Sequence, residues 1–178
     1  MNYMGRISGL ILALVFSATA HAALPSKKKI AAKPQPVSKI LAGEGASFGG
    51  LAGSGFTLLD VRRTADAKKK IERLVLDVGD IQGAPMKGWP GYYYAELKKN
   101  PQRLVIDFSQ MPNARINQQQ IKQRLQGSMA VRNSQMSLDP VDNSLNLTLD
   151  LKQNTKVRVY QVAGKKSTSK VVVDLITE

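Results

Sequence analysis

The chain has 178 residues, with 26 lysines and arginines against 13 aspartates and glutamates, no cysteine and one histidine. Its length and its 43% hydrophobic and 22% charged content are those of one folded domain, with room for an appendage. The only histidine, His21, lies in a segment that we expect to be cleaved off. The remaining chain would therefore exclude catalysis by His or Cys, zinc sites with imidazole or thiolate ligands, and disulfide bonds.

Residues 1–22 have the three parts of a secretory signal peptide. Arg6 carries the positive charge, residues 7–16 form an apolar run, and Ala20-His21-Ala22 suits signal peptidase. The run has about half of the roughly 20 residues that a membrane-spanning helix needs. We therefore expect export to the periplasm, with no integral membrane segment after cleavage.

Residues 23–54 are rich in lysine and proline in their first half and in glycine in their second half. This density of proline and glycine disfavours both helix and strand pairing. We expect a flexible basic and glycine-rich linker. An alternative is that its lysines tether the protein to an anionic surface.

From Phe56 onward, hydrophobic residues recur at every second position, which is typical of strands with one buried face. The segments with this pattern are 56–61, 73–78, 92–98, 103–108, 129–138, 145–151, 157–162 and 170–176, of which 129–138 is the weakest. Short strands of this number predict an all-β sandwich or barrel over residues 55–178. We adopt the sandwich, with two antiparallel or mixed sheets.

Residues 117–126 depart from this pattern. Ile121 and Leu125 are four residues apart, Asn117 is a suitable N-cap, and Gly127 follows the segment. The spacing predicts one short amphipathic helix over an edge or end of the sheets.

Two arginines begin strands of similar sequence, RLVLDV at 73–78 and RLVIDF at 103–108. If the leucines of both strands face inward, Arg73 and Arg103 share the solvent side with Asp77 and Asp107. They could form cross-strand ion pairs. Alternatively, their guanidinium groups could bind the carboxylates of a peptide ligand.

Aromatic residues gather between residues 89 and 94. Strand alternation places Tyr93 on one face and Tyr92 and Tyr94 on the other, close to Trp89. The exposed rings could belong to ordinary sheet packing, or they could form a platform on which sugar rings stack.

No catalytic or metal-binding motif is found in the sequence. Asp77, Asp107, Asp150 and Asp174 lie near strand ends and have the pattern of solvated edge residues rather than of a catalytic pair. We expect no enzyme activity, no cofactor and no metal.

The segments Pro101–Phe108 (PQRLVIDF), Val131-Arg132, Leu145–Leu151 and Val171–Leu175 together resemble the AMIN domain. The resemblance covers residues 56–176. It implies two four-stranded sheets, a place in the bacterial envelope and affinity for peptidoglycan. It also implies a link to N-acetylmuramoyl-L-alanine amidases or type IV pilus secretins, here on another polypeptide. Arg132 stands where the family has an arginine, and is thereby the first candidate for ligand contact.

From these features we expect an exported, non-catalytic module that binds peptidoglycan. A chain this basic usually binds nucleic acid, but export argues against that partner and leaves the acidic components of the envelope. One alternative is a structural partner that docks on a secretin or another envelope complex by strand pairing. Another is binding of anionic lipid through the lysine-rich residues 23–54.

Overall fold

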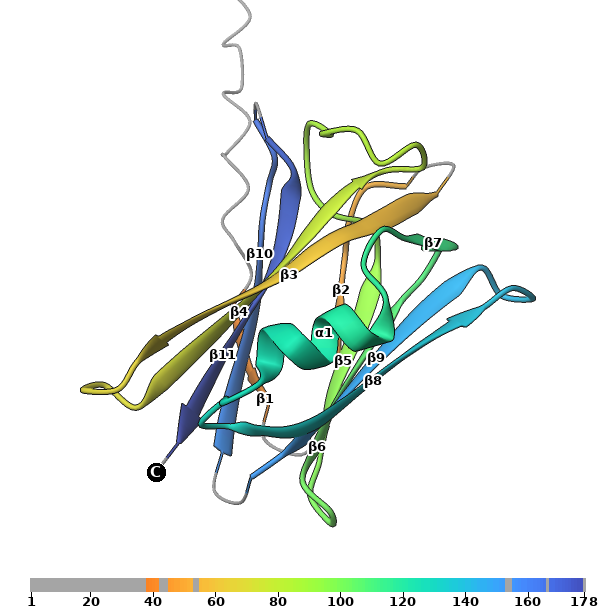
Figure 1. Cartoon of the computed structure of the whole chain (residues 1–178). Coiled ribbons are helices and arrows are strands. Elements are labelled where there is room, and N and C mark those ends of the chain that lie inside the picture. The colour runs from red at the N-terminus through yellow and green to blue at the C-terminus, as the bar shows by residue number, and fades with distance from the viewer. Residues whose placement is uncertain (1–37, 42–44, 53–54, 153–154, 166, 178) are drawn as a thin grey trace, which may run out of the picture. The chain divides into compact units, whose positions relative to one another are not determined.

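The computed structural model describes residues 38–41, 45–52, 55–152, 155–165 and 167–177. They form two sheets and one helix (Figure 1). The first sheet has the order β1 (Lys39–Leu41), β10 (Thr155–Val162), β11 (Ser169–Thr177), β4 (Ile71–Asp80), β3 (Phe56–Asp66) and β7 (Asn113–Ala114). The second has the order β2 (Ala46–Phe48), β5 (Tyr93–Lys98), β6 (Arg103–Phe108), β9 (Ser144–Leu151) and β8 (Val131–Asp139). The predicted all-β sandwich is confirmed.

The core is built by the alternation seen in the sequence. In β9, the leucines at 145, 147, 149 and 151 are buried, while the residues between them are half-buried. The same alternation buries every second residue of β6 and β10, so that apolar faces of both sheets meet in one core. At one end of this core the ring of Tyr93 stacks on Phe48, with ring centres 4.7 Å apart.

The predicted linker is wrong for the part of residues 38–52 that the structure describes. β1 pairs with β10 and β2 pairs with β5, each in antiparallel register. The cause is apolar burial, because Leu41 and Phe48 both enter the core. The folded unit therefore begins at or before Lys39 rather than at residue 55. The predicted signal peptide (1–22) and residues 23–37 lie outside the described residues.

The glycines of this segment permit close packing. A Cβ atom on Gly45 would lie 1.6 Å from the hydroxyl oxygen of Tyr94, and one on Gly50 would lie 2.0 Å from the carbonyl oxygen of Pro90. Gly45 directly precedes β2 and Gly50 follows it, so the two glycines flank the strand. Glycine here allows β2 to lie against its neighbours, which explains why a glycine-rich stretch forms a strand.

The predicted helix is confirmed as α1 (Gln118–Leu125). Asn117 is its N-cap and forms a capping box with Gln120, in which each side chain accepts a hydrogen bond of 2.9 Å from the other residue's backbone. Ile121 and Leu125 are buried, as the spacing predicts.

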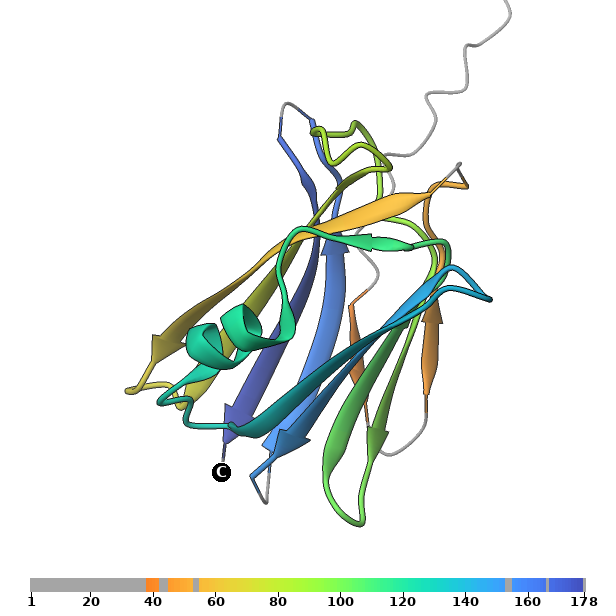
Figure 2. The ribbon, with the colours of Figure 1, turned by 45° about the vertical axis from the view of Figure 1, so that its right-hand side comes forward.

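α1 is bonded to both sheets. Arg63 of β3 donates to the carbonyl oxygens of Arg124 and Gln126, both at 3.1 Å. The Gln118 side chain donates to the Ser134 carbonyl and accepts from Met136 N, both at 2.6 Å, and so covers part of the free edge of β8. β1 and β2 are the edge strands at the other end of each sheet, and Figure 2 shows them on the side away from α1.

Candidate functional site

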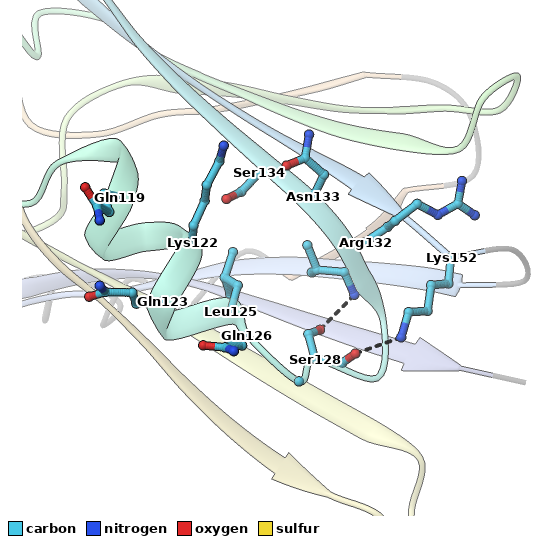
Figure 3. A pocket seen from close by; sticks show the side chains of 12 residues that line it. Gln119, Lys122, Gln123, Leu125, Gln126, Ser128, Arg132, Asn133, Ser134 and Lys152 are labelled. Atoms are coloured by element: carbon cyan, nitrogen blue, oxygen red, sulfur yellow. Dashed lines mark hydrogen bonds between the residues drawn. The ribbon is translucent and has the colours of Figure 1, made fainter.

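A cleft of about 570 Å³ lies between α1 and β8 (Figure 3). Its size falls in the range of small-molecule sites, roughly 300–1,000 Å³. Its lining contains Lys122 from α1, Arg132 from β8 and Lys152 from the end of β9, and none of the described lining residues is acidic. Four amide side chains add donors and acceptors, on Gln119, Gln123, Gln126 and Asn133. The cleft is therefore a cationic, hydrogen-bonding site.

Arg132 owes its direction to a β-bulge. Val131 pairs with Leu151 and Asn133 with Asp150, so Arg132 is the extra residue between two ladder positions. Its side chain is exposed, and in Figure 3 it extends from β8 away from α1. The pKa of Asp150 lies below its usual value, mainly because Arg103 donates a hydrogen bond to it; the charge of Arg132 adds to this effect.

A buried carboxylate binds the loop between α1 and β8, and Ser128 of this loop lines the cleft. Glu72 of β4 is fully buried and accepts hydrogen bonds from Ser128 Oγ at 2.5 Å and from Met129 N at 2.8 Å. Ser128 Oγ in turn accepts from Val131 N at 2.7 Å, and the Ser128 carbonyl accepts from Lys152 Nζ at 2.8 Å. These bonds hold the loop between α1 and β8 in place and orient Lys152, one of the three cations of the cleft.

Sequence reasoning missed Lys122, Ser134 and Lys152, which have no distinctive local pattern. Glu72 had a usable signal. It lies in phase with Leu74, Leu76 and Val78, so the alternation places an acid on the core face.

Arg73 and Arg103 do not share a solvent side as expected, because β4 and β6 belong to different sheets. Their leucines face each other across the core, so the two arginines lie on opposite outer faces. Both arginines form cross-strand ion pairs, but not with Asp77 and Asp107 as expected: Arg73 Nε lies 2.6 Å from Asp174 Oδ1, and Arg103 Nε lies 2.7 Å from Asp150 Oδ1.

The expectation of solvated aspartates is wrong for Asp174 and Asp77, both of which are buried. Asp174 is covered by Arg73 and Arg158 from the two neighbouring strands. Asp77 accepts hydrogen bonds from Arg62 Nε at 2.6 Å and from Thr168 Oγ1 at 2.9 Å. A carboxylate on an outer sheet face is removed from water here because long cationic side chains lie over it.

The tyrosines alternate as predicted: Tyr93 is buried, while Tyr92 and Tyr94 are 49% and 40% exposed. Trp89 is half-buried in the β4–β5 connection. In the described part of the chain, the Tyr93 ring stacks on Phe48 and makes a tilted contact with Phe108, whereas Tyr92, Tyr94 and Trp89 form no ring pair. Tyr92 and Tyr94 lie at the β2–β5 edge of the second sheet, whereas Arg132 lies at its β8 edge, so the structure does not bring them together.

No protein-family model and no curated protein matches the chain. Within the described ranges, no group of three or more His, Cys, Asp or Glu side chains is placed to hold a metal ion. The same residues contain no helix of the length and apolarity that crossing a bilayer requires.

Proposed function

We propose that this protein is an exported, non-catalytic module of the bacterial envelope that binds peptidoglycan. The observation that carries the proposal is the α1–β8 cleft, whose lining contains Lys122, Arg132 and Lys152 and, among the described lining residues, no acidic side chain. The acidic peptide stems of the cell wall match such a site in charge. The AMIN-like pattern of Pro101–Phe108 and Val131-Arg132 supports the same ligand and a periplasmic location.

A polymeric ligand would suit the second sheet. Strands in a sheet are about 4.8 Å apart, and Tyr94 lies on β5, three strands from β8, so the tyrosines and the cleft are roughly 14 Å apart across the sheet. Between them the outer face is polar, with Asp107, Asn146 and Thr148. Tyr92 and Tyr94 would stack on sugar rings while the cleft takes a carboxylate, and only an extended ligand reaches both.

Sedimentation with insoluble peptidoglycan sacculi tests this proposal. The protein purified from the periplasm should pellet with the sacculi, and retention should fall with rising salt because exposed charges are screened. Retention should also fall in the triple variant Lys122→Gln, Arg132→Gln, Lys152→Gln.

The matched control for this variant replaces three exposed lysines elsewhere, Lys87→Gln, Lys99→Gln and Lys165→Gln, and changes the net charge equally. It should retain wild-type binding apart from a uniform loss due to net charge. Full recovery of the wild-type protein in the supernatant at low salt would contradict the proposed function.

A second candidate function is strand pairing with a secretin, and it is favoured by the edge strand β8. Gln118 covers this edge at Ser134 and Met136, but β8 continues to Asp139, and Leu138 is 44% exposed. The amide of Leu138 faces away from β9, in phase with Met136. The substitution Leu138→Pro would therefore block an added strand and keep the β8–β9 ladder. Capture of a secretin after digestion of the wall, lost in this variant, would support docking.

A further inference from the structure

The Ser134 hydroxyl is buried in the wall of the α1–β8 cleft without a hydrogen-bond partner. Ser134 is 3% exposed, and no described group lies within bonding distance of its Oγ. Figure 3 shows this oxygen pointing from β8 toward α1, on the side where the Lys122 side chain lies. Buried hydroxyl groups in folded proteins nearly always have a partner, so an unpartnered one in a cleft indicates a place for a ligand atom.

Lys122 is an uncommitted cation beside this hydroxyl. It is exposed on α1 and makes no hydrogen bond or ion pair with the residues that the structure describes. The cationic side chains near it already have partners within the fold: Lys152 donates to the Ser128 carbonyl, and Arg124 lies 3.6 Å from Asp60. The charge of Lys122 therefore remains for a bound anion.

The negative end of the α1 dipole lies beside the cleft, but its charge is compensated and does not repel an anion there. The C-terminal half of α1 lines the cleft, and the carbonyl groups of a helix C-terminus carry partial negative charge. Arg63 takes the carbonyl oxygens of Arg124 and Gln126. Its guanidinium group compensates that charge, so the positive character of the cleft persists.

We propose that Lys122 Nζ and Ser134 Oγ form a subsite for a free carboxylate of a peptidoglycan stem peptide. One ammonium and one hydroxyl donor suit the two oxygens of a carboxylate. Gln119 and Gln123, one turn apart on α1, pair with the adjoining peptide group. This inference rests on the proposed function, and it names the part of the wall that is bound.

Calorimetric titration of the periplasm-purified chain tests the subsite with three probes. These are a synthetic stem peptide with free carboxylates, the same peptide fully amidated, and inorganic phosphate. The free peptide should bind, and the amidated one should bind about ten- to a hundredfold more weakly, as expected for loss of hydrogen bonds to a charged group. Equal binding of both peptides, or phosphate binding more tightly than the free peptide, would overturn the assignment.

The variants Ser134→Ala and Lys122→Gln should each weaken binding of the free peptide about tenfold or more, whereas Lys165→Gln should leave it unchanged. Ser134→Ala should leave the melting temperature unchanged or raise it, because the hydroxyl that it removes has no partner. A lower melting temperature would show a structural role for Ser134 and overturn the inference.

The outcome for this subsite can be separated from that for wall binding. If sacculi retain the wild-type protein and both variants equally, the subsite is wrong and the proposed function stands. If sacculi do not retain the wild type, the proposed function is wrong. Peptide binding that still depends on Ser134 would then assign the cleft to soluble anionic peptides.

Discussion

Replacing Asp174 by asparagine should destabilise the fold by removing the charge at the centre of a three-strand cluster. Asp174 lies on β11, directly opposite Arg158 on β10 and Arg73 on β4. Arg73 binds both carboxylate oxygens, at 2.6 and 3.1 Å, and Arg158 binds Oδ2. The Asp174 side chain is 0% exposed, so water does not replace these partners while the sheet is intact.

The expected loss follows from the exposure of the partners. Removing one member of a fully buried ion pair costs about 3–5 kcal/mol. Arg73 and Arg158 are 45% and 40% exposed, so water can hydrate their guanidinium groups in the variant. We expect a loss of about 2 kcal/mol, near the contribution of one hydrogen bond to a charged group. This corresponds to a melting temperature lower by about 4–8 °C for a chain of this size.

The loss should depend on pH. Burial acts to raise the pKa of Asp174, but the hydrogen bonds and charges of Arg73 and Arg158 outweigh it, so the pKa lies below the usual value. A carboxyl group with a lowered pKa stabilises the fold above the unfolded-state value, about 3.9, and this stabilisation disappears as the pH falls through the folded-state pKa. Wild type and Asp174→Asn should therefore differ at pH 7 and converge in acid.

Urea unfolding followed by circular dichroism measures both effects, at pH 7 and at pH 3. Asp107→Asn is the matched control, because Asp107 lies on the outer face of β6 and makes no hydrogen bond or ion pair in the described part of the chain. The reasoning is refuted if Asp174→Asn has the unfolding midpoint of this control at pH 7, or if the gap to wild type stays constant in acid.

Two further substitutions test the packing that shapes the cleft and the β2 edge. Ser128→Ala removes the hydroxyl that Glu72 and two backbone amides share. Thermal unfolding should show that the free energy of unfolding falls by about 2–4 kcal/mol. An unchanged melting temperature would mean that the loop does not depend on this hydroxyl. Gly91→Ala places a Cβ 2.4 Å from the ring of Phe56 and should cost about 1–3 kcal/mol, whereas Gly49→Ala, with its nearest atom at 3.7 Å, should cost less; equal losses would contradict the packing argument.

The period-two pattern predicted the strands of the sandwich because nearly all of them have one buried face. β6 has the bounds that its sequence predicts, 103–108. β3 extends five residues beyond the predicted end at 61. These last residues are mostly exposed and show no alternation of burial, and their pairing with β4 holds them in the sheet. β1 and β2 were missed because three residues are too few for a pattern, and their stability comes from Leu41 and Phe48 in the distant core.

The candidate site could be predicted only in part, for a related reason. Periodicity assigns a side chain to the inner or outer face of its strand, but it does not assign the strand to a sheet. Arg73 and Arg103 were therefore placed on one surface when they lie on two. Lys122, Ser134 and Lys152 come from a helix, an edge strand and a strand end, and the tertiary fold alone brings them to one cleft.

Net charge alone does not locate the anion site, because the fold neutralises most of its arginines. Six arginines of the described residues form ion pairs with aspartate or glutamate: Arg62, Arg63, Arg73, Arg103, Arg124 and Arg158. These six arginines share five carboxylates, since Arg73 and Arg158 both pair with Asp174, so most of their charge is offset within the fold. The positive excess is therefore carried mainly by lysines and by the two described arginines without an ion pair, Arg115 and Arg132, the second of which lies at a β-bulge. Two of these lysines and Arg132 line the α1–β8 cleft, and this is why we propose that cleft, rather than the basic surface as a whole, as the place where an anion binds.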